Sequence, residues 1–184
     1  MATIKSFFKW AQESGLIAID PAAGVKLPRA IQGKAPTYIT LDETRELLQS
    51  IKPGRYAKRD LVMLWCFALG LRVAEAAALD VDDVIHPEDD AMPAIRVRGK
   101  GGKERVIPLH MAGYNAIQAY LSDRVDTVGT NPLLACSYGG DSVRRMGTCG
   151  LHRRFANLAK QAGIPAAKRH PHAMRHGFAT RMLF

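Results

Sequence analysis

The most apolar segment of the chain, residues 57–69, constrains the fold more than any other feature. Its composition predicts a buried helix, and Gly70 follows where such a helix would end. The longest apolar run, residues 61–71, is too short to cross a bilayer, which needs about 20 residues. Arg72 comes directly afterwards, and a charge beside such apolar segments is costly unless it meets an anionic partner or an internal acid such as Glu75.

Two short segments rich in β-branched residues predict a β-hairpin. Residues 94–98 and 105–109 flank a glycine-rich turn at residues 99–104. The turn is not a P-loop, because that motif needs a lysine followed by Ser or Thr between a strand and a helix, whereas Lys103 is followed by glutamate between two strands. A turn of this kind can instead bring Lys100 close to a backbone phosphate or a base edge.

Most of the remaining chain is predicted to be helical. The pattern Thr40-Leu41-Asp42-Glu43 is a capping box that starts a helix through about residue 51. Pro171 suits the first turn of the last helix. We expect an α+β fold that is mainly helical, with one small hairpin sheet and an irregular segment at residues 133–150. The other helices are expected at residues 4–14, 74–79, 111–123, 151–162 and 171–183.

The N-terminal part of the chain is expected to be separate from the rest. Residues 4–14 carry apolar side chains at i, i+3, i+4 and i+7, which predicts one amphipathic helix. Residues 18–37 contain repeated proline and glycine together with basic residues, which is typical of an extended basic linker. We therefore expect a helical segment at residues 1–17, a linker at 18–37 and a main domain at 38–184.

The charge of the chain favours a nucleic-acid partner. It contains 26 Lys and Arg against 17 Asp and Glu, a formal charge of +9, which suits a polyanion better than an acidic metabolite. The three cysteines are an odd number without a CxxC pair, and charges stand where a signal peptide would carry its apolar core. We expect a soluble, cytoplasmic protein without membrane contact. The candidates for contact with DNA are Lys103, Arg105, Arg144 and Arg145.

Four residues far apart in the sequence have the chemistry of a phosphate clamp. A helix over residues 171–183 would put His172 and Arg175 at i and i+3 on one face, where Arg72 and Lys100 could join them. Two arginines can hold the non-bridging oxygens of a phosphodiester while negative charge develops there. A histidine can donate a hydrogen bond or move a proton, and a lysine can protonate the leaving 5′-oxygen. This set needs no metal, but it contains no nucleophile.

A metal-dependent nuclease is an alternative interpretation of the same histidines. His172 and His176 stand at i and i+4, a spacing that metal pairs use, and His170 and His152 could add ligands. However, Ala173 occupies the position at which an HExxH motif has its glutamate. We therefore expect no metal site.

Three segments resemble the motif boxes of a known family. Residues 70–75 (GLRVAE), 99–109 (GKGGKERVIPL) and 171–180 (PHAMRHGFAT) are similar to the three boxes of the tyrosine recombinases, or phage integrase family, and occur in that family's order. Residues 6–11 resemble the last helix of its N-terminal core-binding domain, so residues 1–17 would be a remnant of that domain. The resemblance is closest to Xer-like members and runs through nearly the whole chain.

The resemblance implies a role for each matching residue. Glu75 would buttress the first catalytic arginine, and His176 is a neighbour typical of the family rather than an additional catalyst. The family acts on double-stranded DNA through four protomers and uses no metal or nucleotide cofactor. Its two catalytic arginines, its histidine and its general-acid lysine correspond to Arg72, Arg175, His172 and Lys100.

The nucleophile of the family has no counterpart in this sequence. In the family a downstream tyrosine attacks DNA and forms a 3′-phosphotyrosyl link, but here no tyrosine follows Tyr138. We therefore expect the DNA-binding core of a site-specific recombinase or integrase that cuts DNA little or not at all by itself. An intact protomer could supply its own tyrosine in trans, so activity in a mixed assembly is an open alternative. The alternative function is a non-catalytic DNA-binding regulator or a remnant of an integrase.

Overall fold

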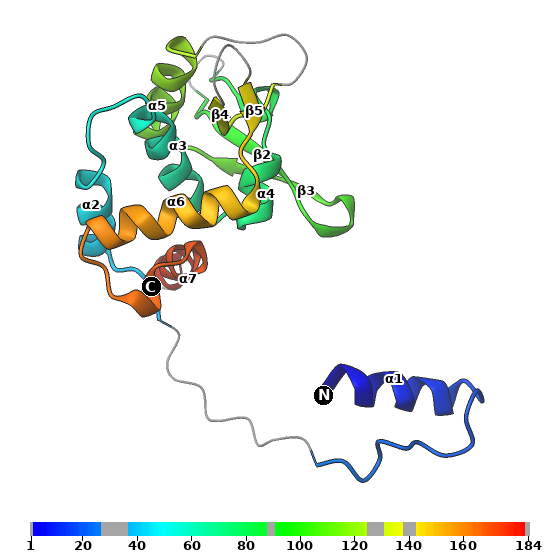
Figure 1. Cartoon of the computed structure of the whole chain (residues 1–184). Coiled ribbons are helices and arrows are strands. Elements are labelled where there is room, and N and C mark those ends of the chain that lie inside the picture. Colours follow the sequence, from blue (N-terminus) through cyan, green and yellow to red (C-terminus); the bar gives the residue numbers. More distant parts are fainter. Residues whose placement is uncertain (1, 27–36, 88–90, 125–130, 138–142, 183–184) are drawn as a thin grey trace. The chain divides into compact units, whose positions relative to one another are not determined.

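The chain divides into two compact units, Met1–Ala35 and Pro36–Phe184 (Figure 1). The larger unit carries all the residues of the predicted phosphate clamp. No helix in the described parts of the chain is long and apolar enough to cross a membrane. The computed structural model describes residues 2–26, 37–87, 91–124, 131–137 and 143–182.

The smaller unit is built on helix α1 (Ala2–Glu13). The residues after this helix turn back along it, because Lys5 Nζ donates a hydrogen bond to the carbonyl oxygen of Val25 at 2.7 Å. The described beginning of the predicted linker is therefore folded against the helix rather than extended. The later part of that linker, residues 27–36, lies outside the described residues.

Helix α3 (Ala57–Ala68) is the centre of the larger unit. The prediction of a buried helix here is confirmed, since Val62, Met63, Leu64, Cys66 and Phe67 have no exposed surface. Its neighbours are one helix that follows it closely in sequence and three helices from more distant segments, as Figure 1 shows. They are α4 (Val73–Ala78), α5 (Met111–Ser122), α6 (Thr148–Gln161) and α7 (Pro171–Met182).

Helix α2 (Leu41–Gln49) begins with the predicted capping box. The backbone N–H of Glu43 donates to Thr40 Oγ1 at 3.2 Å, and the N–H of Thr40 donates to Glu43 Oε2 at 2.8 Å. These bonds satisfy amides that the first turn of a helix leaves without partners. Leu47 then faces the core and is fully buried.

The predicted hairpin is confirmed and forms part of a three-stranded antiparallel sheet. Strand β2 (Ala94–Arg98) pairs with β3 (Glu104–Pro108) on one side and with the short β1 (Val84–Ile85) on the other. The segment predicted to be irregular contains a second sheet, β4 (Ala135–Ser137) with β5 (Val143–Arg145). These two strands have three residues each, too few to display the alternation from which a strand is predicted. The mainly helical α+β fold with small antiparallel sheets is thus confirmed.

Gly70 brings the end of α3 into close contact with α7. Its φ of +78° lies in the left-handed region, and a Cβ built there would stand 2.6 Å from Cδ1 of Phe178. A larger residue would therefore be strained in its backbone and would clash with the ring. This close approach sets the start of the segment that carries Arg72 beside the helix that carries Arg175.

Candidate active site

The site is organised around the carboxylate of Glu75, which is only 6% exposed. Glu75 lies in the first turn of α4, three residues after the N-cap residue Arg72. The carboxylate reaches back to the helix start, where it accepts hydrogen bonds from the backbone N–H of Arg72 and from its Nη1, both at 2.8 Å. Such a bond satisfies one of the free amides of the helix N-terminus and ties the arginine side chain to the helix.

Two further arginines reach the same carboxylate from other elements. Arg105, on β3, donates from its two terminal nitrogens to the two oxygens of Glu75 at 3.1 and 2.7 Å. Arg175, on α7, has its Nη1 at 3.8 Å from Glu75 Oε2 and donates to the carbonyl oxygen of Gly70. Three arginines from α4, β3 and α7 therefore share one acid.

The charges in this cluster do not cancel. Burial alone would raise the pKa of Glu75, but hydrogen bonds from Arg105 and Arg72 lower it to about 2, so the carboxylate is ionised at neutral pH. Three guanidinium groups against one carboxylate leave two positive charges. Burial, and then the charge of Arg72, lower the pKa of Arg175. An added anion would relieve this repulsion, so the cluster is suited to bind one.

His172 lies on α7, three residues before Arg175, as the sequence predicts. Burial lowers its pKa, followed by the neighbouring His176, His170, Arg175 and Arg72. The rings of His172 and His176 pack edge to face with centroids 4.3 Å apart. The lowered pKa favours the neutral imidazole, a form that has one N–H to donate and one nitrogen to accept.

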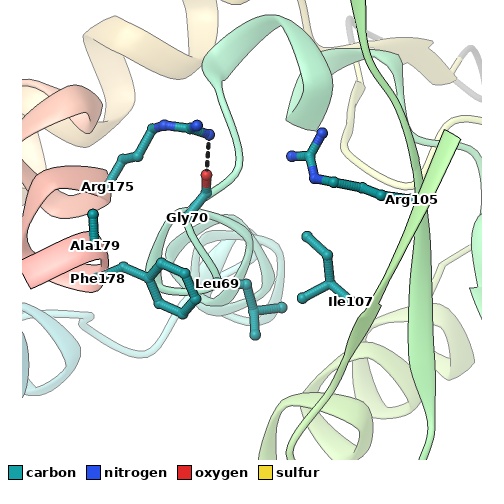
Figure 2. A pocket seen from close by; sticks show the side chains of 7 residues that line it. All are labelled: Leu69, Gly70, Arg105, Ile107, Arg175, Phe178 and Ala179. Atoms are coloured by element: carbon teal, nitrogen blue, oxygen red, sulfur yellow. Dashed lines mark hydrogen bonds between the residues drawn. The ribbon is translucent and has the colours of Figure 1, made fainter. Parts of the chain in front are cut away.

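A pocket of about 300 Å³ opens between β3 and α7 (Figure 2). Figure 2 shows Arg175 and Arg105 on opposite sides, with the apolar side chains of Phe178, Leu69 and Ile107 below them. The pocket thus combines positive charge with an apolar floor. Its lining consists of Leu69, Gly70, Arg105, Ile107, Arg175, Phe178 and Ala179.

Lys100 lies in the turn between β2 and β3, where residues 100–102 form a short 3-10 segment. The turn is closed by a hydrogen bond from the N–H of Gly99 to the carbonyl oxygen of Lys103 at 2.7 Å. The side chain of Lys100 lies outside the described part of the structure. The side chain of Lys103 is exposed.

The other predicted DNA contacts lie outside the Glu75 cluster. Arg144, on β5, is exposed. Arg145 donates to the carbonyl oxygens of Ala77 and Leu79 at 3.0 and 2.9 Å and forms an ion pair with Asp80. The guanidinium of Arg145 thus holds β5 to the end of α4.

The histidines of the alternative metal site lie on or at the start of helices α6 and α7. Nδ1 of His170 accepts a hydrogen bond from the N–H of Ala173 at 3.1 Å, which caps the start of α7. His152 is exposed on α6. Among the described residues, no three His, Cys, Asp or Glu side chains are grouped so that they could share a metal ion.

The contact of Arg105 with Glu75 was not predicted from the sequence. It reads as one more basic residue of an exposed hairpin, and 30 positions separate it from Glu75. One signal was available, because side chains two positions apart point to the same face of a strand. Arg105 should therefore share a face with Ile107, and both line the pocket.

The mainly helical fold with small antiparallel sheets is that of the catalytic domains of the tyrosine recombinases. Residues 37–183 match the phage integrase family. The chain therefore belongs to that family, which confirms the resemblance found in its motifs.

Curated relatives match the chain over its whole length. It is 33% identical to the tyrosine recombinase XerC of Mycobacterium leprae and covers 62% of that protein. It is 30% identical to the tyrosine recombinase XerD of Listeria monocytogenes and covers 61% of it. The chain thus spans about three fifths of the length of these relatives.

Solved structures share the fold. The crystal structure of XerA recombinase matches with a TM-score of 0.65 and 26% identity, over 98% of this chain and 60% of that one. A lambda integrase dimer bound to a COC′ core site matches with a TM-score of 0.62 and 20% identity, over 97% of this chain and 63% of that one. At 20% identity the second likeness concerns the fold alone.

Proposed function

We propose that residues 38–184 form the phosphate-binding core of a site-specific DNA recombinase. The observation that carries this proposal is the convergence of Arg72, Arg105 and Arg175 on the buried Glu75, with two positive charges left over. The side chain of Arg72 is 60% exposed, so its remaining donors are open to a DNA backbone. Double-stranded DNA is the proposed substrate, and other recombinase protomers are the proposed partners.

In this proposal the arginines and the histidine bind the scissile phosphodiester. Arg72 and Arg175 hold its non-bridging oxygens, because bidentate hydrogen bonds from guanidinium strengthen as charge develops on them. His172 donates a hydrogen bond to the same group or moves a proton. Lys100, in the hairpin turn, protonates the leaving 5′-oxygen.

Other basic residues hold the duplex. Lys103 at the hairpin turn and Arg144 on β5 are exposed, so we propose that they contact DNA phosphates without reading sequence. Arg145 is engaged by carbonyl oxygens and by Asp80, so we expect its effect on DNA affinity to pass through the position of β5. The helical segment at residues 1–17 is proposed to belong to a core-binding domain, joined through residues 18–37.

The experiment compares two ligands for the 184-residue polypeptide: an intact duplex and a nicked duplex bridged by vanadate, which imitates the charge of the transition state. We expect Arg175→Ala to weaken binding of the vanadate-bridged duplex by about tenfold or more, and binding of the intact duplex much less. We expect the matched change Lys103→Ala to weaken both equally and to reduce the salt dependence by about one charge. Equal effects of the two changes on the two ligands would contradict the proposal.

A covalent assay tests cleavage. The five tyrosines of the printed sequence all precede Arg175, so we propose that this polypeptide by itself forms no 3′-phosphotyrosyl link. The assay incubates it with a nicked suicide substrate and looks for a protein–DNA adduct after denaturation. An adduct would show that one of these tyrosines is a nucleophile, and the proposal of an inactive core would then be abandoned.

A further inference from the structure

We propose that Arg105 is a positioning residue that holds the lysine-bearing turn against the arginine cluster through Glu75. This inference rests on the proposed function of the same site. It assigns to Arg105 a role different from contact with the DNA backbone, which is what its place in a basic hairpin suggests. Three features of its guanidinium carry the argument.

The first feature is the two-point ion pair with Glu75. Both terminal nitrogens of Arg105 donate to the carboxylate, at 3.1 and 2.7 Å, and the side chain is 38% exposed. The hydrogen bond to Glu75 is also the main cause of the raised pKa of Arg105. A guanidinium whose two terminal nitrogens are held in this way has a defined orientation, unlike a solvated surface arginine.

The second feature is that the guanidinium lies near the turn. A Cβ built on Gly99 would lie 3.6 Å from Nη1 of Arg105 and 3.3 Å from the carbonyl oxygen of Lys103. The guanidinium that binds Glu75 therefore also lies close to Gly99, the residue before Lys100. In this proposal, a change of Arg105 shifts the backbone that carries the proposed general acid.

The third feature is that Arg105 lines the pocket, opposite Arg175 (Figure 2). The other ion pairs of the hairpin point elsewhere, because Arg98 joins Glu104 at 3.2 Å and Asp83 at 3.1 Å. Among the described ion pairs, the one between Arg105 and Glu75 thus joins the hairpin to the arginine cluster. Arg98 offers a matched control, since it is an arginine of the same hairpin with acidic partners of its own.

The experiment uses the 184-residue polypeptide with Arg105→Lys, and Arg98→Lys as its control. Lysine keeps the charge but cannot reproduce the two-point contact. We expect the ratio of affinities for the vanadate-bridged and the intact duplex to fall about tenfold in R105K. The salt dependence of binding to the intact duplex should be unchanged. We expect R98K to keep the preference.

Two further measurements separate positioning from direct contact. In a Glu75→Gln background, R105K should cause little additional loss, because its effect passes through that carboxylate. Hydrogen exchange at the Gly99 amide should become faster in R105K than in R98K, since the turn has lost its anchor. The exchange measurement needs no DNA, so it tests Arg105 even if the wild-type chain shows no preference for vanadate and the proposed function fails.

Three results would overturn the inference. One is an R105K variant that retains both the preference and the slow exchange of the Gly99 amide. Another is a salt dependence reduced by one charge, which would make Arg105 a phosphate contact. The last is a double variant in which R105K reduces the preference as much in the E75Q background as it does alone. Thermal unfolding of each variant serves as the check that it is folded.

Discussion

The three arginines around Glu75 differ in what each has left to offer a ligand. A guanidinium carries five N–H donors. In the described contacts, Arg72 gives one side-chain donor to Glu75, while Arg105 gives two to the same acid. Arg72 is also the most exposed of the three side chains, at 60%. At the scale of single residues, Arg72 is therefore suited to bind an anion and Arg105 to brace the site.

His172 provides a prediction at the same scale. Its pKa is lowered first by burial and next by His176, so we expect it to titrate below the ordinary value of 6.5. The change His176→Asn removes one cause of the shift and should raise the pKa of His172. Titration of the ring protons by NMR measures this. An unchanged pKa in the variant would mean that the edge-to-face pair has no electrostatic effect.

At the scale of helices, a buried carboxylate joins α3 to α6. Asp60 is completely buried and accepts hydrogen bonds from Arg59, at 2.7 Å, and from Nε of Arg154, also at 2.7 Å. Arg59 is buried as well and stacks over the ring of Tyr56. This group joins α3 to α6, and the carboxylate of Asp60 balances the charges of its arginines.

Removing that acid should be costly. The change Asp60→Asn keeps the size of the side chain but leaves two arginines without a carboxylate, one of them buried. We expect a loss of about 3–5 kcal/mol in the free energy of unfolding, measured by urea denaturation. The matched control is Asp123→Asn, which breaks an exposed ion pair with Lys58 and should cost about 0–1 kcal/mol. Similar losses in both variants would show that Asp60 does not unite the helices as proposed.

At the scale of the whole larger unit, Glu75 connects α4, β3 and α7, so its ionisation should affect global stability. Its pKa lies at about 2 against an ordinary 4.5. A carboxyl group whose pKa is lowered in the folded state stabilises the fold at pH values above its ordinary pKa. This stabilisation is lost as the pH falls from about 4.5 towards about 2. Because the carboxylate is buried, its full effect is on the order of 3 kcal/mol.

The prediction is an acid-dependent loss of stability that Glu75→Gln reduces. Urea denaturation between about pH 5 and pH 2.5 should give a steeper fall in the free energy of unfolding for the wild type than for E75Q. Glu104→Gln, at an exposed ion pair with Arg98, should retain the wild-type slope. If E75Q and the wild type lose stability in parallel, the carboxylate is not ionised as the geometry implies.

The sequence allowed much of the secondary structure to be predicted. Burial of α3 follows from the apolar run that starts at Leu61, the start of α2 follows from its capping box, and the hairpin follows from two short strands around a glycine-rich turn. Each of these signals comes from residues within one element. The short strands β4 and β5 were missed because three residues do not display a period.

The types of residue in the site were also visible, since Arg72, Lys100, His172 and Arg175 stand in segments that resemble one family's motifs. What the sequence by itself determined is therefore the chemistry available and the elements that carry it. Only the tertiary structure decided that Arg105 binds Glu75, 30 positions away, and that Arg175 reaches the carbonyl oxygen of Gly70, 105 positions away. The physical reason is that local periodicity sets which face of an element a side chain occupies, whereas packing of distant elements sets which charges meet.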